Sequence, residues 1–587
     1  MKNDYIVRKT YLSFVIVSIL TSITAMVGIL IDNIIVGRYL GQEALGAMGI
    51  VGPVSLIFSA VGNICSGGGG ARAAQALGRG ESDKVCLIFT VNILFVLVIG
   101  GLITVLGLIF TPQIAVLLGA KGDLFEPSCR YLYGYFLGAL PTIMLTAMMS
   151  FVKIDGSPKL PLVCIVVMSA SNIILDFAMV KMGMFGMALA TTISYCLALA
   201  TVFLHFLKKT SRLKLVKPKK MFSEISQMVV TGFPTAISRI SDTIKVMLLN
   251  NMMVAFVSVA AVTALNVRTQ ANNFLGAIVI GIGQATTPTI SMFFGEEDKT
   301  AIKDTLKITF KFGLFLTLIL TMVLLIFPGI FSEIFGVTEP EILSMTSMAI
   351  RLFAITIPIT LINTVLMNFY QCTKRTGMAT SISLLQSLVY TVVFAFVLIR
   401  PFEANGIWAA FFLGEVFTLA TVIVCVFVKN KKFSLSISSI MMLDKDFGGN
   451  ENDRLELSIG NSMDEVMTIS SGIYKFGKNR DIDDKTLNIL SLCIEEMAGN
   501  VVRHSFKEGE KRWLDIIILD RNEHIVIRFR DNGTAFDPIA YLNNDTPKEG
   551  YGIPLIHSFA DDFEYRYNMG INNTIIHLKK HNIKKFG

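Results

Sequence analysis

Three polar side chains stand inside long apolar stretches of the sequence. Asp32 follows an apolar run that begins at Tyr11 and has no basic residue beside it, and Asn172 and Asp176 lie in a second run. An amide and a carboxylate four residues apart share one face of a helix. A charge at membrane depth costs about 3 kcal/mol, so such residues usually belong to a functional site. They predict a cavity for H+ or Na+, because buried carboxyl groups take up protons readily and oxygen ligands also suit Na+.

Simpler interpretations of these acids stay open. The side chain of Asp32 could extend to the membrane interface from the end of its helix. Asp176 could cap the exit-side end of its helix near Lys181. Another group of charges recurs at a spacing of three residues: Arg239, Asp242 and Lys245. We interpret this group as a paired structural cluster, because unpaired charges there would be costly.

Three further motifs follow one another near the end of the chain. Glu496 and Asn500 lie one turn apart on a predicted helix, so both side chains point at one site. Asp531-Asn532-Gly533 follows a predicted strand, where an acid can accept a hydrogen bond from an adenine amino group. Gly550 and Gly552 precede an apolar helix start, where backbone N–H groups can meet phosphates. Each motif alone is common, but the three in this order indicate a nucleotide site.

The distribution of polar residues divides the chain. Its 587 residues are 53% hydrophobic and 16% charged, which is typical of a protein that lies largely in lipid. Apolar runs continue to about residue 432, and beyond about residue 447 they stop and five of the six histidines appear. We predict four parts: an N-terminal six-helix lobe at 1–215, a second six-helix lobe at 216–432, a linker at 433–450 and a soluble domain at 451–587.

The apolar runs predict twelve membrane-spanning helices. Their expected ranges are 11–37, 45–77, 86–110, 131–153, 160–181, 185–207, 228–256, 259–293, 303–328, 344–371, 378–399 and 405–428. Basic residues gather in alternate loops, as in loops that stay in the cytoplasm. We therefore expect a multi-pass protein of the plasma membrane with both termini in the cytoplasm. The net charge of +8 belongs to these loops and gives no reason to expect nucleic acid as a partner.

The membrane part contains an internal repeat. Residues 67–84 align without gaps to residues 282–299, and further matches occur at nearly the same offset. Two six-span halves in the same orientation predict two lobes related by an axis along the membrane normal, which is an architecture of transporters. The same offset places apolar residues opposite the two acids: Met247 and Val393. The acids are therefore not required by the repeated scaffold.

The membrane part resembles the multidrug and toxic compound extrusion (MATE) family over residues ~8–430. The resemblance lies in I-D-N-I-I-V-G-R-Y-L-G around Asp32, in S-N-I-I-L-D with Asn172 and Asp176, and in G-M-A-L-A-T at Gly186–Thr191. It implies that Asp32, Asn172 and Asp176 carry the coupling cation. One departure is that the first span has no proline, whereas some members bend this helix at a proline when protonated.

Strands and helices alternate after residue 452, which predicts an α/β sandwich. Residues ~452–580 resemble the GHKL (Bergerat-type) ATPases, nearest to the anti-sigma-factor serine kinases. The resemblance implies Glu496 as general base, Asn500 as Mg2+ ligand and Asp531 as the adenine contact. It assigns three glycines to the nucleotide lid and phosphates: Gly533, Gly550 and Gly552. Ala535 departs from the family, which often has a second glycine there.

We predict a cation-coupled (H+ or Na+) antiporter that exports amphipathic, cationic small molecules by alternating access. We expect its cytoplasmic domain to bind ATP and Mg2+ and to regulate the transporter. The sequence contains no P-loop, so we do not expect ATP to drive transport. Two alternatives remain. One is a membrane sensor whose tail is a serine/threonine kinase acting on a cytoplasmic regulatory protein. The other is a lipid-precursor flippase, which would need a more basic cavity. Whether the tail is a kinase, an ATPase or a passive sensor stays open.

Overall fold

The chain divides into two compact units. One unit is Ser13–Met442, and the other is Leu443–Gly587 together with Met1–Leu12. The computed structural model describes residues 5–208, 211–334, 339–431, 434, 436–444, 446–449, 453–506, 512–521, 524–543, 552–568 and 570–580.

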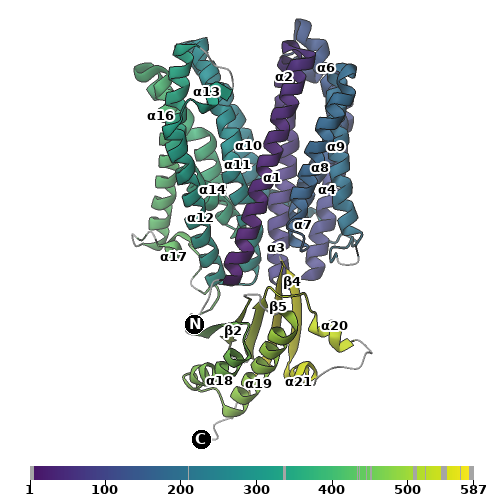
Figure 1. The fold of residues 1–587 in the computed structure, drawn as a ribbon, viewed down its shortest axis with the longest axis vertical. Helices are drawn as coiled ribbons and strands as arrows, with labels where there is room; N and C mark the ends of the chain where they lie inside the picture. The colour runs from purple at the N-terminus through teal and green to yellow at the C-terminus, as the bar shows by residue number, and fades with distance from the viewer. Residues whose placement is uncertain are drawn as a thin grey trace. The chain divides into compact units, whose positions relative to one another are not determined.

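The first unit consists of two groups of apolar helices (Figure 1). The N-lobe contains α1 (Tyr5–Leu40), α2 (Gln42–Asn63), η1 (Ile64–Gly69), α3 (Gly70–Gly78), α4 (Ser82–Ile109), α5 (Thr111–Leu117), η2 (Gly122–Leu124), α6 (Phe125–Leu137), α7 (Ala139–Ile154), α8 (Leu160–Met179), η3 (Val180–Met182) and α9 (Gly183–Phe206). The C-lobe contains α10 (Met221–Phe256), α11 (Val259–Gly295), α12 (Lys299–Ile326), α13 (Ile330–Ile334), α14 (Pro340–Cys372), α15 (Thr376–Leu384), η4 (Leu385–Val389) and α16 (Tyr390–Asn430). A short helix, α17 (Ile437–Ile440), follows.

The helical membrane fold predicted from the apolar runs is confirmed. Within the described residues, 8 segments are long and apolar enough to cross a membrane, or 9 if a bent helix pair is one span. Two of these segments, Leu160–Phe206 and Thr376–Asn430, are 47 and 55 residues long and each holds more than one helix. α16 breaks its helical geometry at Glu403, where φ is 50°. The count of twelve spans and the lobe boundaries stay predictions.

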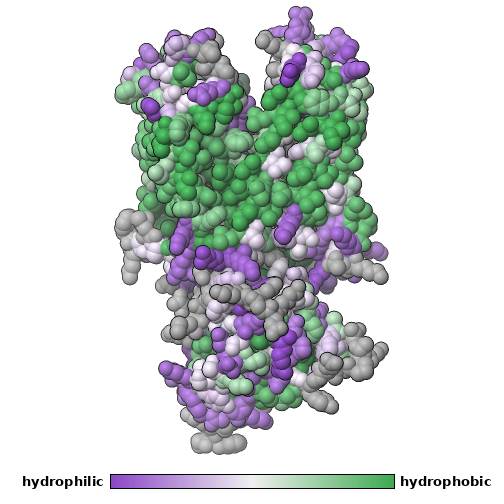
Figure 2. Space-filling model, viewed as in Figure 1, coloured by the Kyte–Doolittle hydropathy of each residue, from purple (hydrophilic) through white to green (hydrophobic). Residues whose placement is uncertain are grey.

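The two lobes pack tightly at the α3 end of the unit. A Cβ atom on Gly68 would collide with the backbone of α10 at Met228, and one on Gly295 would collide with the backbone of α3 at Gln75. Small residues at helix contacts allow this close approach. Gly295 belongs to the repeat partner of residues 67–84, so the duplicated segments meet one another here. Figure 2 shows an apolar band across the viewed face of this unit and a notch between the lobes at the opposite end.

Polar contacts join the lobes at the same end. Arg72 forms an ion pair of 2.7 Å with Glu224 at the start of α10. The side-chain amide of Gln75 donates to the carbonyl oxygen of Cys372 at 2.7 Å. The α3 end is therefore held by glycine packing and by side-chain bonds together.

The second unit is an antiparallel sheet covered by helices. Its five strands lie in the order β1-β2-β3-β5-β4. The strands are β1 (Arg454–Gly460), β2 (Trp513–Asp520), β3 (His524–Asp531), β4 (Asp562–Asn568) and β5 (Ile571–Lys579), and the helical elements are α18 (Met463–Lys478), α19 (Asp484–Asn500), η6 (Val501–Ser505), α20 (Pro538–Asn543) and α21 (Gly552–Phe559). The predicted α/β sandwich, with its hairpin of β2 and β3, is confirmed.

Alternation of apolar residues creates the core between sheet and helices. Ile516 of β2 pairs in register with Phe529 of β3, and both are buried in one cluster. α19 adds Leu490 and Ile494 from one face, as its helical spacing predicts. This core fixes α19 against the sheet and so positions Glu496 near the end of the helix.

Candidate functional site

A glycine brings the first acidic helix against the second. Gly28 of α1 lies so close to α8 that a Cβ atom would stand 2.9 Å from the Ser169 hydroxyl oxygen. Asp32 lies one turn beyond Gly28, and Asn172 lies one turn beyond Ser169. The close crossing of α1 and α8 therefore carries the polar residues of both helices to one place.

The structure brings together all three predicted residues of the N-lobe. The Asn172 side-chain amide donates to Oδ1 of Asp176 at 3.2 Å and to the Thr191 hydroxyl of α9 at 3.4 Å. The carboxyl groups of Asp32 and Asp176 lie within hydrogen-bonding reach of each other. The expectation that the two acids share a site therefore agrees with the geometry.

Asp176 is buried, Asp32 is half-buried, and both carboxyl groups are incompletely satisfied. Asp176 is 0% exposed, so it does not cap a helix end at the surface. Oδ1 of Asp32 and Oδ2 of Asp176 find no N–H or O–H donor among the described residues. The phenol groups of Tyr131 and Tyr195 lie close enough to interact with the Asp32 charge. The pair therefore has carboxyl oxygens free to hold a proton or a metal cation.

The C-lobe holds a buried carboxylate that the sequence analysis missed. Glu415 of α16 is 9% exposed. Its Oε1 accepts from the Thr360 hydroxyl at 2.8 Å and from the Gln386 amide at 3.2 Å. Its Oε2 accepts from the Asn363 amide at 2.6 Å. These donors come from α14 and η4, so both carboxylate oxygens are satisfied by neutral groups.

Two cations accompany Glu415. Arg268 of α11 is 6% exposed, and its guanidinium carbon lies 3.4 Å from the ring centre of Phe411. Lys245 of α10 lies 5.8 Å from the same ring and donates to Asp242 at 2.8 Å. The predicted pairing within the charged group of α10 is thus present for these two residues. The third member, Arg239, forms no ion pair within the described part of the chain.

One sequence signal would have found these residues. Arg268 and Glu415 are single charges inside apolar runs, as Asp32 is. Neither Arg268 nor Glu415 was named in the sequence analysis. Their partners come from other helices, which spacing along one helix does not reveal.

The predicted nucleotide residues of the second unit converge on the start of α21. A Cβ atom on Gly552 would lie 2.5 Å from Oε2 of Glu496 and 3.4 Å from the amide nitrogen of Asn500. A side chain at position 552 would displace the Glu496 carboxylate from its present place. Gly550 lies outside the described residues.

Asp531 is held at the end of β3 with one oxygen engaged. Its Oδ1 accepts from the Gly533 backbone N–H and from the Asn572 amide, both at 2.8 Å. Its Oδ2 accepts no hydrogen bond from the described residues. Burial raises the pKa of Asp531 from 3.8 to about 6. Gly533 lies against η6, where a Cβ atom would meet the Ser505 carbonyl oxygen at 2.5 Å.

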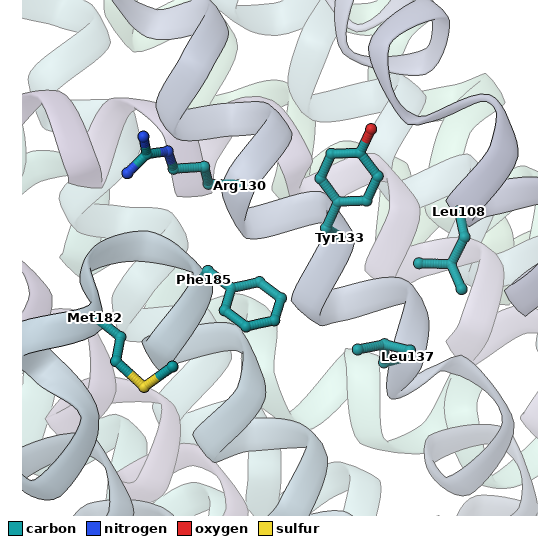
Figure 3. A pocket seen from close by; sticks show the side chains of 6 residues that line it. All are labelled: Leu108, Arg130, Tyr133, Leu137, Met182 and Phe185. Carbon is teal, nitrogen blue, oxygen red and sulfur yellow. The ribbon is translucent and has the colours of Figure 1, made fainter.

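A surface pocket lies apart from these sites. Figure 3 shows its lining by six residues of α4, α6, η3 and α9: Leu108, Arg130, Tyr133, Leu137, Met182 and Phe185. Its one charged residue, Arg130, forms an exposed ion pair of 2.6 Å with Glu126. This pocket contains none of the predicted site residues.

Comparison with known proteins agrees with the fold of both parts of the chain. Residues 18–178 and 234–397, more than half of the chain, match the family MatE. The chain belongs to the MatE family. Residues 461–580 match the histidine kinase-like ATPase domain. The resemblances inferred from the sequence are therefore confirmed.

Relatives cover the membrane part of this MatE member. The multidrug export protein MepA of Staphylococcus aureus (strain bovine RF122 / ET3-1) is 22% identical over 435 residues, 72% of this chain and 95% of the relative. MepA of Staphylococcus saprophyticus is 25% identical over 301 residues, 49% of this chain and 66% of that relative, so this match spans about two thirds of its length.

A solved structure shares the fold. It is described as the outward-facing conformation of a multidrug resistance MATE family transporter of the MOP superfamily. It has a TM-score of 0.66 and 19% identity, and the match covers 71% of this chain and 94% of that chain.

Proposed function

We propose that the protein is a cation-coupled antiporter of the plasma membrane that exports amphipathic, cationic small molecules by alternating access, with an ATP-binding domain that regulates it. The observation that carries the proposal is the meeting of half-buried Asp32 with buried Asp176 beside Asn172. Like charges this close repel strongly in a buried site. The pair is therefore suited to hold H+ or Na+ between its oxygens and to release it when α1 and α8 move apart.

The arrangement of the lobes supports alternating access. The glycine and side-chain contacts join the lobes at the α3 end, while a notch separates them at the other end. The basic loops assign the α3 end to the cytoplasm. With that orientation, the notch would face outward, as in an outward-open state. Closing the notch and separating the α3 end would open the unit to the cytoplasm instead.

The second unit supports binding of ATP with Mg2+. Mg2+ usually keeps few protein ligands and binds phosphate oxygens, which suits a single amide at Asn500 beside the start of α21. Among the described residues, no group of three or more His, Cys, Asp or Glu side chains provides a phosphate-independent metal site. Asp531 would accept from the adenine amino group through Oδ2, and the backbone at Gly552 would meet the phosphates.

A kinase activity of the tail is the second candidate. ATP would supply the phosphoryl group, and Glu496 lies beside Gly552, where it could take the proton of an attacking hydroxyl or water. The full chain would then signal the state of the transporter to a cytoplasmic protein. Glu496→Gln should leave ATP binding intact and abolish phosphorylation or hydrolysis.

The coupling proposal is tested in proteoliposomes. Wild type, Asp32→Asn and Glu126→Gln are reconstituted, and ethidium transport is recorded under an imposed pH or Na+ gradient. We expect Asp32→Asn to fall to the level of empty vesicles, because it removes one carboxylate of the pair. Glu126 is an exposed acid whose side chain is 71% accessible, so its variant should match wild type.

Gradient-driven accumulation by Asp32→Asn equal to wild type would overturn the coupling role. Counterflow exchange of labelled ethidium without a gradient should persist in Asp32→Asn, because exchange needs substrate binding and lobe movement but no net cation flux. This second readout separates loss of coupling from loss of folding.

A further inference from the structure

The C-lobe contains a buried guanidinium without a polar partner. Arg268 is 6% exposed and forms no hydrogen bond or ion pair with any described residue. It rests between two aromatic rings, with its guanidinium carbon 3.4 Å from the centre of Phe411 and 5.3 Å from that of Phe353. Stacking satisfies the faces of the guanidinium plane but leaves its five N–H groups without acceptors.

Glu415 does not serve as the missing acceptor. It lies one turn from Phe411 on α16, yet no ion pair joins it to Arg268 among the described residues. Its two oxygens instead accept from the side chains of Thr360, Gln386 and Asn363. These neutral donors leave the charge of Glu415 in place, so Glu415 attracts Arg268 across space without accepting from its N–H groups.

A second cation lies on the same aromatic ring. Lys245 stands 5.8 Å from the Phe411 centre, and its side chain is 14% exposed. Its partner Asp242 is 44% exposed, so that carboxylate is well hydrated and weakly held. Arg268 and Lys245 therefore place two cations around one ring, while the N-lobe places two acids together.

The N–H donors of a buried guanidinium are costly to leave without an acceptor, even with a carboxylate charge nearby. We infer that Arg268, with Lys245 nearby, binds the anionic group of an amphiphile, a carboxylate, sulfonate or phosphate. The planar N–H fork of Arg268 matches two oxygens of such a group. The inference rests on the proposed transport function, which it extends from cationic substrates to those with an anionic group.

The test measures binding to the full-length protein in nanodiscs without any ion gradient. Two probes carry the same dansyl fluorophore and the same alkyl chain, and one ends in a carboxylate while the other ends in trimethylammonium. We expect Arg268→Gln to weaken binding of the carboxylate probe at least about tenfold, the usual scale for a lost charge-assisted hydrogen-bond pair. Binding of the ammonium probe should stay within about twofold.

Matched variants control for charge and for folding. Arg351 is exposed on α14, so Arg351→Gln should bind both probes as wild type does. Arg268→Lys keeps the charge but loses the fork, so its carboxylate affinity should fall between wild type and Arg268→Gln. If Arg268→Gln fails to fold, the comparison of Arg268→Lys with wild type decides the question.

The lipid composition identifies the source of the anion. If a lipid phosphate occupies the site, anionic phosphatidylglycerol should weaken carboxylate-probe binding in wild type but not in Arg268→Gln. If a soluble amphiphile is the ligand, that lipid should have no effect.

Two results would overturn the inference. One is that Arg268→Gln and Arg268→Lys bind the carboxylate probe as tightly as wild type does. The other is that these variants lose affinity for both probes to the same degree. Asp32→Asn should bind both probes as wild type does, because this test measures binding and not transport. The result therefore does not depend on whether the coupling proposal holds.

Discussion

The N-lobe brings two acids together, half-buried Asp32 and buried Asp176, whereas the C-lobe buries a carboxylate, Glu415, near a cation, Arg268. Asp32 and Asp176 face each other with unsatisfied oxygens. In the C-lobe, Glu415 is fully hydrogen-bonded and Arg268 is the unpaired group. The repeat places exposed apolar residues, Met247 and Val393, where the N-lobe carries its acids. The duplicated scaffold therefore supports two different chemistries.

The difference suggests a division of work between the lobes. On the proposals above, the pair of acids would exchange a cation, while Arg268 on its aromatic ring would bind an anionic group. The shared elements are the glycine contacts at the α3 end, where Gly68 and Gly295 allow backbone packing. Both lobes would move about this contact, so occupancy of one site could bias the other through a common change of state.

The largest expected effect separates the two carboxylates. Asp176→Asn should abolish gradient-driven ethidium accumulation in proteoliposomes, because Asp176 shares the cation with Asp32. In Glu415→Gln, the ratio of accumulation with a gradient to accumulation without one should be the same as in wild type. Glu415 already accepts hydrogen bonds from neutral donors, so we do not expect it to hold the coupling cation. Equal loss of coupling in both variants would break the comparison between the lobes.

A smaller effect is expected from the helix crossing that assembles the N-lobe site. Gly28→Leu should lower coupled transport about tenfold or more, because any Cβ atom at this position already crowds the Ser169 hydroxyl. Gly49→Leu is the matched control, since nothing lies within 4 Å of a Cβ atom there. Binding of the carboxylate probe in the C-lobe should remain unchanged in both variants. Normal transport by Gly28→Leu would show that the close crossing is not needed.

Changes in the second unit should have the smallest effect on transport, because this unit is expected to act on both lobes alike. Their effect is measured on ATP binding. Burial raises the pKa of Asp531 to about 6, so its carboxylate protonates below that pH. ATP affinity, measured by calorimetry on the full-length protein, should be flat above about pH 7 and should fall below pH 6. Asp531→Asn should bind ATP weakly at every pH. An unchanged pH profile in that variant would remove Asp531 from the site.

The same shift has a consequence of opposite sign for stability. The folded carboxyl group binds its proton more tightly than the unfolded group, whose pKa is 3.8. Without nucleotide, the contribution of Asp531 therefore makes the second unit more stable as the pH falls from 7 towards 4. Asp531→Asn should remove this contribution from thermal unfolding curves.

The acids of the N-lobe could be predicted because a lone charge in an apolar run stands out without any knowledge of packing. Arg268 and Glu415 carry the same signal, but their surroundings come from α10, α14 and η4, which the spacing along α11 or α16 does not reveal. Gly28 was also missed as a packing residue, since its role depends on Ser169 of another helix.

The second unit shows the same limit. The β2–β3 hairpin and α19 followed from apolar alternation, and both are present. β4 was missed because its sequence, D-F-E-Y-R-Y-N, alternates charged and aromatic residues at the edge of the sheet. The bond from Asn572 to Asp531 depends on the register of β3 with β5, which no local pattern specifies.

The central claim is that the N-lobe pair carries the coupling cation, and cation release on substrate binding tests it most directly. Ethidium is added to purified full-length protein in weakly buffered detergent, and released H+ is recorded with a pH indicator and released Na+ with radioactive sodium. We expect release from wild type and from Glu415→Gln, and none from Asp176→Asn. Undiminished release of the same cation from Asp176→Asn would contradict the account.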